Sequence, residues 1–235
     1  VGNHLNDKKE KLPSNKTCNA YLKEVFRFYR FSGQQDESTK QLKVLSDMRI
    51  IVHNSVGVKR TLYRNTFHGY LQEKGHIGKT IEQDKIVVLL QECANSRDQV
   101  LLLLLAETGF RIGELLGVRY ATDIDYERHL LYVNFREDNE NGARAKNAEY
   151  RKAKISDATF EILQFYIEEY KDLIFQQEYL IINISGDYAG KPMQDSGVYA
   201  LMERLQKKTG IKVTPHMLRH YFANARRKAG WKLEL

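Results

Sequence analysis

The sequence lacks several features that define other classes of protein. Its 235 residues contain only two cysteines, Cys18 and Cys93, which are too few and too far apart for a disulfide framework or a zinc knuckle. The longest apolar run, Val100 to Ala106, is far shorter than the roughly 20 residues of a membrane span. The N-terminus also shows no charged-then-apolar signal pattern. We therefore expect a soluble, cytoplasmic protein with reduced thiols and no membrane-spanning segment.

The sequence also lacks internal repeats and motifs for binding nucleotides or metals. The sequence contains no internal repeat, no GKS/T phosphate-binding loop and no acidic metal cluster. It does contain a basic surplus, with 37 lysines and arginines against 30 acidic residues and a formal charge of +7. This balance predicts a polyanionic partner, for which nucleic acid and an anionic membrane surface are the competing interpretations. With 42% hydrophobic residues, the chain can bury the core of one large domain or two modest ones.

Residues 1–74 are expected to form a small helical domain. After Pro13 and Ser14, apolar residues recur at helical spacing and basic residues occupy another face. The apolar residues are Leu22, Val25, Phe26 and Tyr29, and the basic residues are Lys23, Arg27 and Arg30. Such a basic face can follow a DNA backbone, although a merely solvated face also explains three charges.

The rest of this domain is less regular. The amphipathic pattern repeats from Gln41 to Ile51, which predicts a second helix. Basic residues then mark a loop that leads into a short helix or an extended stretch, and these are Lys59, Arg60 and Arg64. Gly75 and Gly78 interrupt the apolar pattern, so we divide the chain into residues 1–74 and 75–235.

The second domain begins with two predicted helices. Thr80 and Gln83 form a capping-box pattern for a helix from Ile81 to Cys93. Another helix starts near Ser96 or Arg97 and carries the longest apolar run. Because that run is hydrophobic on nearly all sides, we expect this helix at the centre of the domain.

A tight turn follows this buried helix in the stretch ETGFRIGELLGV. Gly109 ends the helix and Arg111 lies in the turn. A short helix from Ile112 to Val118 then places Glu114 on the same side as Arg111. An arginine held in a tight turn suits bidentate binding of a phosphate. An ion pair with Glu114 that fixes the turn is the structural alternative, and both can hold together.

A β-hairpin is predicted next, with strands at His129–Phe135 and Tyr150–Ile155 joined by a polar turn. Five basic residues crowd its second arm, namely Arg144, Lys146, Arg151, Lys152 and Lys154, and composition alone chooses none of them. The elements predicted after the hairpin are a helix from Ala158 to Tyr170, a strand from Tyr179 to Ile184 and a helix from about Ser196 to Lys208.

The stretch from Thr214 to Gly230 reads TPHMLRHYFANARRKAG. Thr214 is a good N-cap and Pro215 suits the first helical position, so a helix is predicted to start here. His216 and Arg219 then share one face of its first turn, where free N–H groups favour an anion such as phosphate. The structural alternative is an Arg219 paired with a carboxylate beside an ordinary histidine.

Three of these motifs together resemble the catalytic domain of tyrosine recombinases, the integrases of phages and transposons. They are the buried helix followed by TGFRIGEL, the hairpin with its lysine, and His-x-x-Arg in PHMLRHYFA. The segment LPSNKTCNAYLKEVFRFYRF resembles the later helices of the family's core-binding domain, and ARAKNAEYRKAKIS resembles integrases of Gram-positive mobile elements. The resemblance implies an α+β, mainly helical fold, with a small helical core-binding domain and a mixed catalytic domain that contains a small β-sheet or hairpin.

The resemblance also implies a role for each matching residue. Arg111 and Arg219 correspond to the two arginines that clamp the scissile phosphate. His216 corresponds to the histidine that helps to move the proton of the nucleophile and hydrogen-bonds the phosphate. Fixed cations of this kind stabilise the negative charge that develops around a pentacoordinate phosphorus, so no metal or nucleotide cofactor is expected.

The hairpin lysine of the family protonates the leaving 5′-oxygen. Lys146 is our assignment for it because it lies near the turn, and Lys152 and Lys154 are the alternatives. A lysine whose pKa is lowered by neighbouring arginines is a competent general acid. The reaction implied for the family stores the energy of the broken bond in a 3′-phosphotyrosine.

The partners that the resemblance implies are double-stranded DNA and further copies of the same protein. Residues assigned to DNA binding in the first domain are Lys23, Arg27, Arg30, Lys59 and Arg60. The family acts as a tetrameric synapse, so a homo-oligomer is expected for the intact protein. A bacterial cytoplasm, in association with the nucleoid, is the expected location.

The sequence departs from the family pattern at its end. Relatives continue with a second histidine or tryptophan and then the tyrosine nucleophile, whereas this sequence stops at Leu235. Tyr221 lies too close to Arg219 to be that nucleophile and is interpreted as packing. We therefore expect a truncated site-specific recombinase or integrase that binds DNA without cleaving it. A natural DNA-binding regulator that retains the recombinase fold is the alternative, and a type IB topoisomerase fits the short motifs less well.

Overall fold

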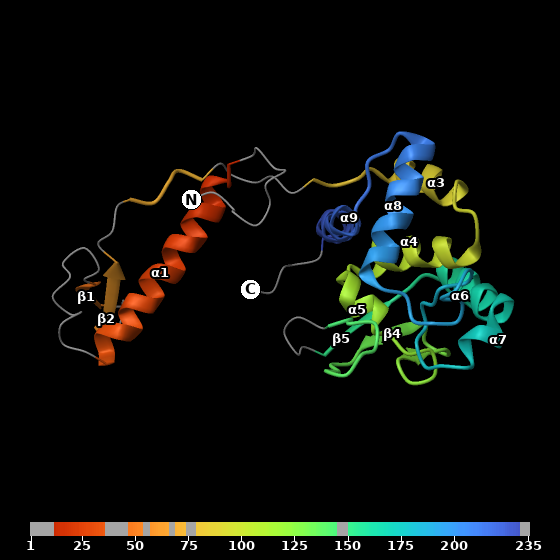
Figure 1. The fold of residues 1–235 in the computed structure, drawn as a ribbon, viewed down its shortest axis with the longest axis horizontal. Helices are drawn as coiled ribbons and strands as arrows, with labels where there is room; N and C mark the ends of the chain where they lie inside the picture. The colour runs from red at the N-terminus through yellow and green to blue at the C-terminus, as the bar shows by residue number, and fades with distance from the viewer. Residues whose placement is uncertain are drawn as a thin grey trace. The chain divides into compact units, whose positions relative to one another are not determined.

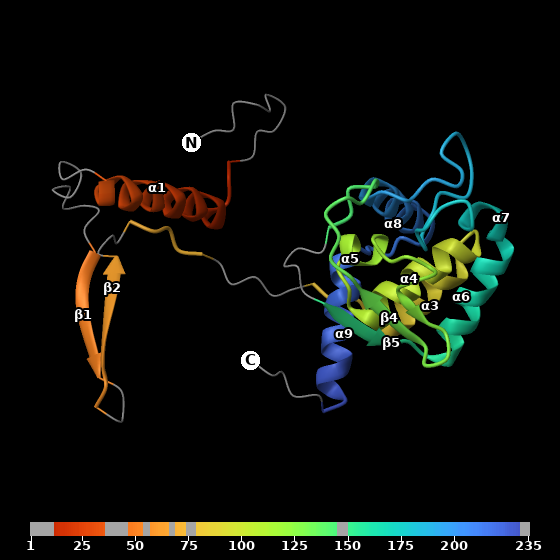
Figure 2. The same ribbon diagram turned by 90° about the horizontal axis from the view of Figure 1, so that it is seen from below.

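The computed structural model describes residues 12–35, 47–53, 57–65, 69–73, 79–144 and 150–230. The chain divides into two compact units, Val1–Ile77 and Gly78–Leu235. Figures 1 and 2 label the helices of each unit and the strands β1, β2, β4 and β5. The assignment of residues 1–74 to a core-binding domain stays a prediction.

The first unit combines one helix with a two-stranded sheet. Helix α1 (Asn15–Gln35) is as expected, and strand β1 (Asp47–His53) pairs antiparallel with β2 (Lys59–Asn65), Ile50 lying opposite Leu62. The helix predicted for residues 41–51 is wrong where the structure describes this segment, because β1 begins at Asp47. A short amphipathic run does not distinguish helix from strand, and the β-branched residues at positions 50–52 favour the strand.

A buried asparagine joins α1 to the segment that follows β2. Asn19, only 3% exposed, donates from Nδ2 to the carbonyl oxygen of Leu71 at 2.8 Å and accepts from the backbone N–H of Leu71 at 2.8 Å. Both hydrogen-bonding groups of the amide are therefore satisfied. The apolar stripe predicted for α1 is only partly buried, since Val25 is 48% exposed and Tyr29 is 37% exposed.

The second unit is built around helix α4, shown in Figure 1. This helix (Ser96–Thr108) starts after Asn95, whose side chain caps the N–H of Asp98, and Leu101, Leu102, Leu104 and Leu105 are fully buried. The predicted central position is confirmed, because α6 and α9 both pack against α4. The other helices of this unit are α3 (Gln83–Gln91), α5 (Ile112–Leu116), α6 (Asp157–Glu169), α7 (Lys171–Ile174), α8 (Asp195–Thr209) and α9 (Pro215–Lys228).

A three-stranded antiparallel sheet completes the second unit. Its strands, in spatial order, are β3 (Ile124–Asp125), β4 (Leu130–Val133) and β5 (Arg151–Lys154), with Leu131 opposite Ala153. The predicted hairpin is therefore confirmed, and residues 145–149 of its turn lie outside the described residues. The mixed, mainly helical fold class is confirmed as well.

Two local predictions for this unit are wrong. Helix α3 starts after Glu82, which makes no side-chain cap, so the predicted Thr80 capping box does not form. Ile81 is 4% exposed, so its side chain is buried in the core just before the helix begins. The segment 179–184 forms isolated bridges, with Tyr179 opposite Arg119 and Ile182 opposite Pro192, in place of the predicted strand. The apolar residues of this segment pack into the core. Their hydrophobicity therefore predicted burial correctly, but it did not show whether the segment pairs with a strand.

Candidate active site

Helix α9 starts as the sequence predicts. The side chain of Thr214 caps the helix by accepting from the backbone N–H of Met217 at 3.2 Å, and Pro215 occupies the first turn. His216 and Arg219 follow in that turn, where His216 is exposed and Arg219 is half-buried. The capping prediction is confirmed, and the roles of these two side chains in chemistry stay predictions.

Gly109 forms the turn that delivers Arg111 from the end of α4. Its φ of 61° lies in the left-handed region, which glycine adopts without strain. Phe222 of α9 lies against the same residue, since a Cβ on Gly109 would come within 2.8 Å of the Cγ atom of Phe222. Phe110, 1% exposed, anchors the turn in the core. A larger residue at position 109 would therefore strain the backbone and displace α9.

The two predicted arginines come together at this turn. Nη1 of Arg219 donates a hydrogen bond to the carbonyl oxygen of Gly109, so α9 is joined to the turn two residues before Arg111. Residues 110 positions apart in sequence thereby meet at one point. The structure thus brings Arg111 and Arg219 into one site, as the sequence predicts.

Glu114 lies between the arginines with a side chain that is only 3% exposed. Its Oε1 atom is 2.7 Å from Nη1 of Arg111, and its Oε2 atom accepts from the backbone N–H of Arg111 at 2.7 Å. Nη1 of Arg219 lies 3.9 Å from Oε2 of the same carboxylate. The predicted Arg111–Glu114 ion pair is therefore present, and the buried carboxylate orients the more exposed Arg111 side chain.

Arg151 is a third arginine of this cluster, and the sequence did not single it out. It opens β5, donates from Nη1 to Oε2 of Glu114 at 2.9 Å, and lies over the ring of Phe110 at 5.7 Å. The signal that could have found it is strand alternation, because Ala153 and Ile155 face the core and Arg151 has the same parity. Lys152 and Lys154 have the opposite parity and are exposed, so the structure does not place them with the arginine cluster.

The charges of the cluster are unbalanced. Burial would raise the pKa of the Glu114 carboxyl, but hydrogen bonds from Arg111 and the charge of Arg151 outweigh it and hold that pKa below its ordinary value. Burial lowers the pKa of the Arg219 guanidinium, and the like charges of Arg151 and Arg111 lower it further. Three guanidinium groups share one carboxylate, so a bound anion would relieve their mutual repulsion. The site therefore suits a phosphate group.

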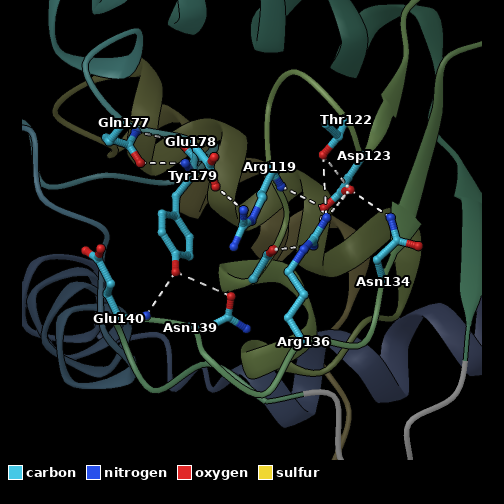
Figure 3. Close-up of polar contacts among 11 residues, drawn as sticks. Arg119, Thr122, Asp123, Asn134, Arg136, Asn139, Glu140, Gln177, Glu178 and Tyr179 are labelled. Atoms are coloured by element: carbon cyan, nitrogen blue, oxygen red, sulfur yellow. Dashed lines mark hydrogen bonds and ion pairs between the residues drawn. The ribbon is translucent and has the colours of Figure 1, made fainter.

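Lys146 lies outside the described residues, but the first arm of the hairpin (residues 134–144) is described up to two positions before it. Asp123, with no exposed side-chain surface, accepts from both terminal nitrogens of Arg136 at 2.7 Å and from Nδ2 of Asn134 at 2.7 Å. Figure 3 shows these contacts converging on Asp123. Burial would raise the pKa of Asp123, but the hydrogen bonds from Arg136, the backbone of Arg119 and Asn134 together outweigh it, so that pKa is lowered.

A second anchor holds the same arm further along. The phenol oxygen of Tyr179 accepts from the backbone N–H of Glu140 at 2.9 Å and lies 3.4 Å from Oδ1 of Asn139, as Figure 3 shows. Nδ2 of Asn141 donates to the carbonyl oxygens of Leu116 at 3.0 Å and of Met193 at 2.9 Å. The first arm is therefore fixed to the body of the unit before the chain reaches residue 146.

His216 has a histidine neighbour one helical turn away. Its Nε2 atom lies 3.0 Å from Nε2 of His220, so one ring donates and the other accepts. His220 was not singled out in the sequence, although the spacing of four residues indicates such a pair on a helix.

The residues assigned to DNA binding in the first unit lie on α1 and β2. Lys23 of α1 is exposed and lies 5.9 Å from the ring centre of Tyr70, whereas Arg27 pairs with Glu24 at 2.9 Å. Lys59 and Arg60 are exposed on β2. Arg30 belongs to α1, but its side chain lies outside the described part.

Among the described residues, no helix combines the length and the apolar character needed to cross a bilayer.

Comparison with known proteins matches residues 79–235 to the phage integrase family. The chain is 30% identical over 154 residues to transposase A from transposon Tn554 of Staphylococcus aureus, covering 65% of this chain and 42% of that protein. It is 31% identical over 154 residues to tyrosine recombinase XerA of Saccharolobus solfataricus, covering 65% of this chain and 44% of that protein. The chain thus matches less than half the length of either relative.

Solved structures share the fold. The Tn1549 transposon integrase in complex with transposon right end DNA has a TM-score of 0.64 at 18% identity, covering 95% of this chain and 70% of the other. The crystal structure of XerA recombinase has a TM-score of 0.54 at 24% identity, covering 67% of this chain and 54% of the other. At these identities the likeness supports the fold alone.

Proposed function

The chain belongs to the phage integrase family, and we propose that it is a site-specific DNA recombinase of a mobile element. The observation that carries the proposal is the convergence of Arg111, Arg151 and Arg219 on Glu114. A cluster with more guanidinium groups than carboxylates, held by buried hydrogen bonds, suits the phosphodiester group of a DNA strand.

In the proposed reaction, Arg111 and Arg219 bind the two non-bridging oxygens of the scissile phosphate. The hydroxyl oxygen of a tyrosine attacks phosphorus while the bond to the 5′-oxygen breaks, which leaves a 3′-phosphotyrosine and a 5′-hydroxyl. His216 accepts the proton of the nucleophile, and Lys146 donates a proton to the leaving 5′-oxygen. A 5′-hydroxyl from a partner strand reverses these steps and releases the tyrosine. Fixed guanidinium groups stabilise the pentacoordinate phosphorus without reorganising.

Glu114 supports the arginines without touching the phosphate in this scheme. Its two oxygens hold Arg111 and Arg151 from the buried side, so the remaining N–H groups of Arg111 are free to point toward the ligand. Tyr221 is not the proposed nucleophile, because it packs against the hydrophobic core from within α9. We propose that a polypeptide of residues 1–235 alone binds DNA without cleaving it.

The first unit is proposed to contact the DNA duplex as a core-binding domain. Lys23, Arg27, Arg30, Lys59 and Arg60 would contact its backbone, and the complete protein would act as a tetramer on two DNA sites. Substitution of these residues is expected to weaken DNA binding at low salt and to lower its salt dependence.

Two measurements test the proposal. Fluorescence anisotropy with a duplex of about 30 base pairs, long enough for many backbone contacts, should show binding that weakens steeply as salt rises. Salt-independent binding, or none, would overturn a role on DNA. Incubation with a nicked suicide duplex should give no covalent adduct on a denaturing gel for residues 1–235. In the complete protein, Arg111→Gln and Arg219→Gln should abolish the adduct and change duplex affinity far less.

A further inference from the structure

A cavity of about 790 Å³ lies beside Arg111. It is bounded by the start of α5, the first arm of the hairpin and the first residue of α8. Its lining residues are Arg111, Ile112, Gly113, Phe135, Arg136, Glu137, Gly142, Arg144 and Asp195. Three arginines and two acidic residues therefore face one space, and the proposed scheme uses only Arg111.

The backbone of Arg144 is fixed against α5 by a glycine. A Cβ on Gly113 would lie 2.8 Å from the carbonyl oxygen and 3.1 Å from the backbone nitrogen of Arg144, so only glycine allows this approach. Nδ2 of Asn139 also donates to the carbonyl oxygen of Ala143 at 2.9 Å, immediately before Arg144. The Cα of Arg144 is thus held at the edge of the cavity while its side chain remains exposed.

The two other arginines of the cavity already have carboxylate partners. Arg136 is held by Asp123, as Figure 3 shows, and Arg111 is held by Glu114. Within the described part of the chain, no acidic residue pairs with Arg144. Glu137 and Asp195 also line the cavity, yet neither forms an ion pair with any described residue. Arg144 therefore lines this cavity without an ion-pair partner among the described residues, and Arg111 of the arginine cluster lies on the same wall.

We propose that Arg144 binds a second backbone phosphate of the DNA strand, next to the phosphate held by Arg111 and Arg219. This inference rests on the proposed function, because it takes DNA as the ligand. Arg111 belongs to both the arginine cluster and the cavity, so the two phosphates would be neighbours along one strand. Phe135, 45% exposed, offers an apolar wall for the deoxyribose between them. Arg144 is a binding residue in this scheme, with no part in proton transfer.

The test uses residues 1–235 and duplex DNA of about 30 base pairs, in salt between about 50 and 300 mM. Arg144→Gln should lower the slope of log affinity against log salt by about 0.9, the value for one lost phosphate contact. Arg144→Lys keeps the charge and should keep most of that slope while losing affinity about threefold, because lysine cannot bind a phosphate with two parallel N–H groups.

Arg128→Gln is the matched control. Arg128 lies in the turn between β3 and β4 with a 77% exposed side chain, so Arg128→Gln should leave the slope unchanged. The inference is overturned if Arg144→Gln gives the same slope and affinity as Arg128→Gln while the unsubstituted protein binds DNA normally. If the unsubstituted protein shows no salt-dependent binding, the proposed function itself fails. Melting temperatures equal to that of the parent protein establish that all three variants fold.

Discussion

Glu114 and Arg151 join the two halves of the candidate site through a hydrogen bond of 2.9 Å, although they lie 37 positions apart in sequence. Glu114 belongs to the short helix α5 after the Arg111 turn, and Arg151 opens the second strand of the hairpin. Because the carboxylate is buried and the hydrogen bond is charge-assisted, this contact fixes the hairpin relative to the turn.

Glu114→Gln should destabilise the protein by about 2 kcal/mol at neutral pH, because Arg111 and Arg151 lose their shared counter-charge. The folded state lowers the pKa of Glu114, so its stabilising effect is present above the ordinary glutamate pKa of about 4.3. That effect is lost as the pH falls through the lower, folded-state pKa. Urea unfolding at several pH values should therefore show the difference between variant and parent shrinking below about pH 4. A difference that grows in acid would contradict this assignment.

Arg151→Gln should cost about 1–2 kcal/mol of unfolding free energy, since Glu114 loses a charge-assisted hydrogen bond. Lys152→Gln, one residue later on the exposed face of β5, should stay within about 0.5 kcal/mol of the parent. In a double-mutant cycle with Glu114→Gln, the two effects should be non-additive by about 1 kcal/mol. Additive effects would show that the 2.9 Å contact does not couple the hairpin to the turn.

Asp123→Asn should destabilise the protein by about 3 kcal/mol, because the half-buried guanidinium of Arg136 would lose the buried carboxylate that accepts hydrogen bonds from both its terminal nitrogens. Asp138→Asn changes an exposed acid in the same arm and should stay within about 0.5 kcal/mol of the parent. Urea unfolding at neutral pH measures both. Equal, small effects would mean that Asp123 does not anchor the first arm.

Gly113→Ala should destabilise the protein by about 1–2 kcal/mol, because the new Cβ meets the backbone of Arg144, which is itself fixed. Gly197→Ala is the comparison within another helix, where the Cβ would meet the flexible side chain of Met193 at 2.9 Å. There the better helix propensity of alanine, worth up to about 1 kcal/mol, offsets the contact. Chemical denaturation should therefore separate the two variants, and equal stabilities would contradict the close approach at Gly113.

Local chemistry made much of the fold predictable. The N-cap at Thr214, the glycine stop at position 109 and the all-round hydrophobicity of α4 depend on nearest neighbours in sequence, and the structure confirms each of them. Pairing is not local, which explains why β1 was predicted as a helix and residues 179–184 as a strand. Only tertiary contact decides whether a short apolar run pairs with a neighbouring strand or packs without one.

In the candidate site, too, local contacts were predictable from the sequence and contacts between distant residues were not. Arg111 and Glu114 are three residues apart, so their ion pair follows from helical spacing. Arg151 joins them across a hairpin whose register the sequence leaves open, and Asp123 meets Arg136 only after β3 and β4 have paired. The sequence therefore predicts the arginines of two motifs and the Glu114 partner of Arg111, whereas the contribution of Arg151 and the Asp123–Arg136 contact became visible only in the fold.

The hydrogen bond from Arg219 to Gly109, with Phe222 packed on the same residue, also sets an order of assembly during synthesis. The turn leaves the ribosome first, and about a hundred residues must follow before α9 is available to meet it. Contacts of such long sequence separation form late in folding. A nascent chain that ends before Thr214 therefore carries Arg111 without its partner. We expect the proposed phosphate site to form only when α9 packs against the turn. A nascent chain without α9 would then be unable to bind a DNA strand at Arg111.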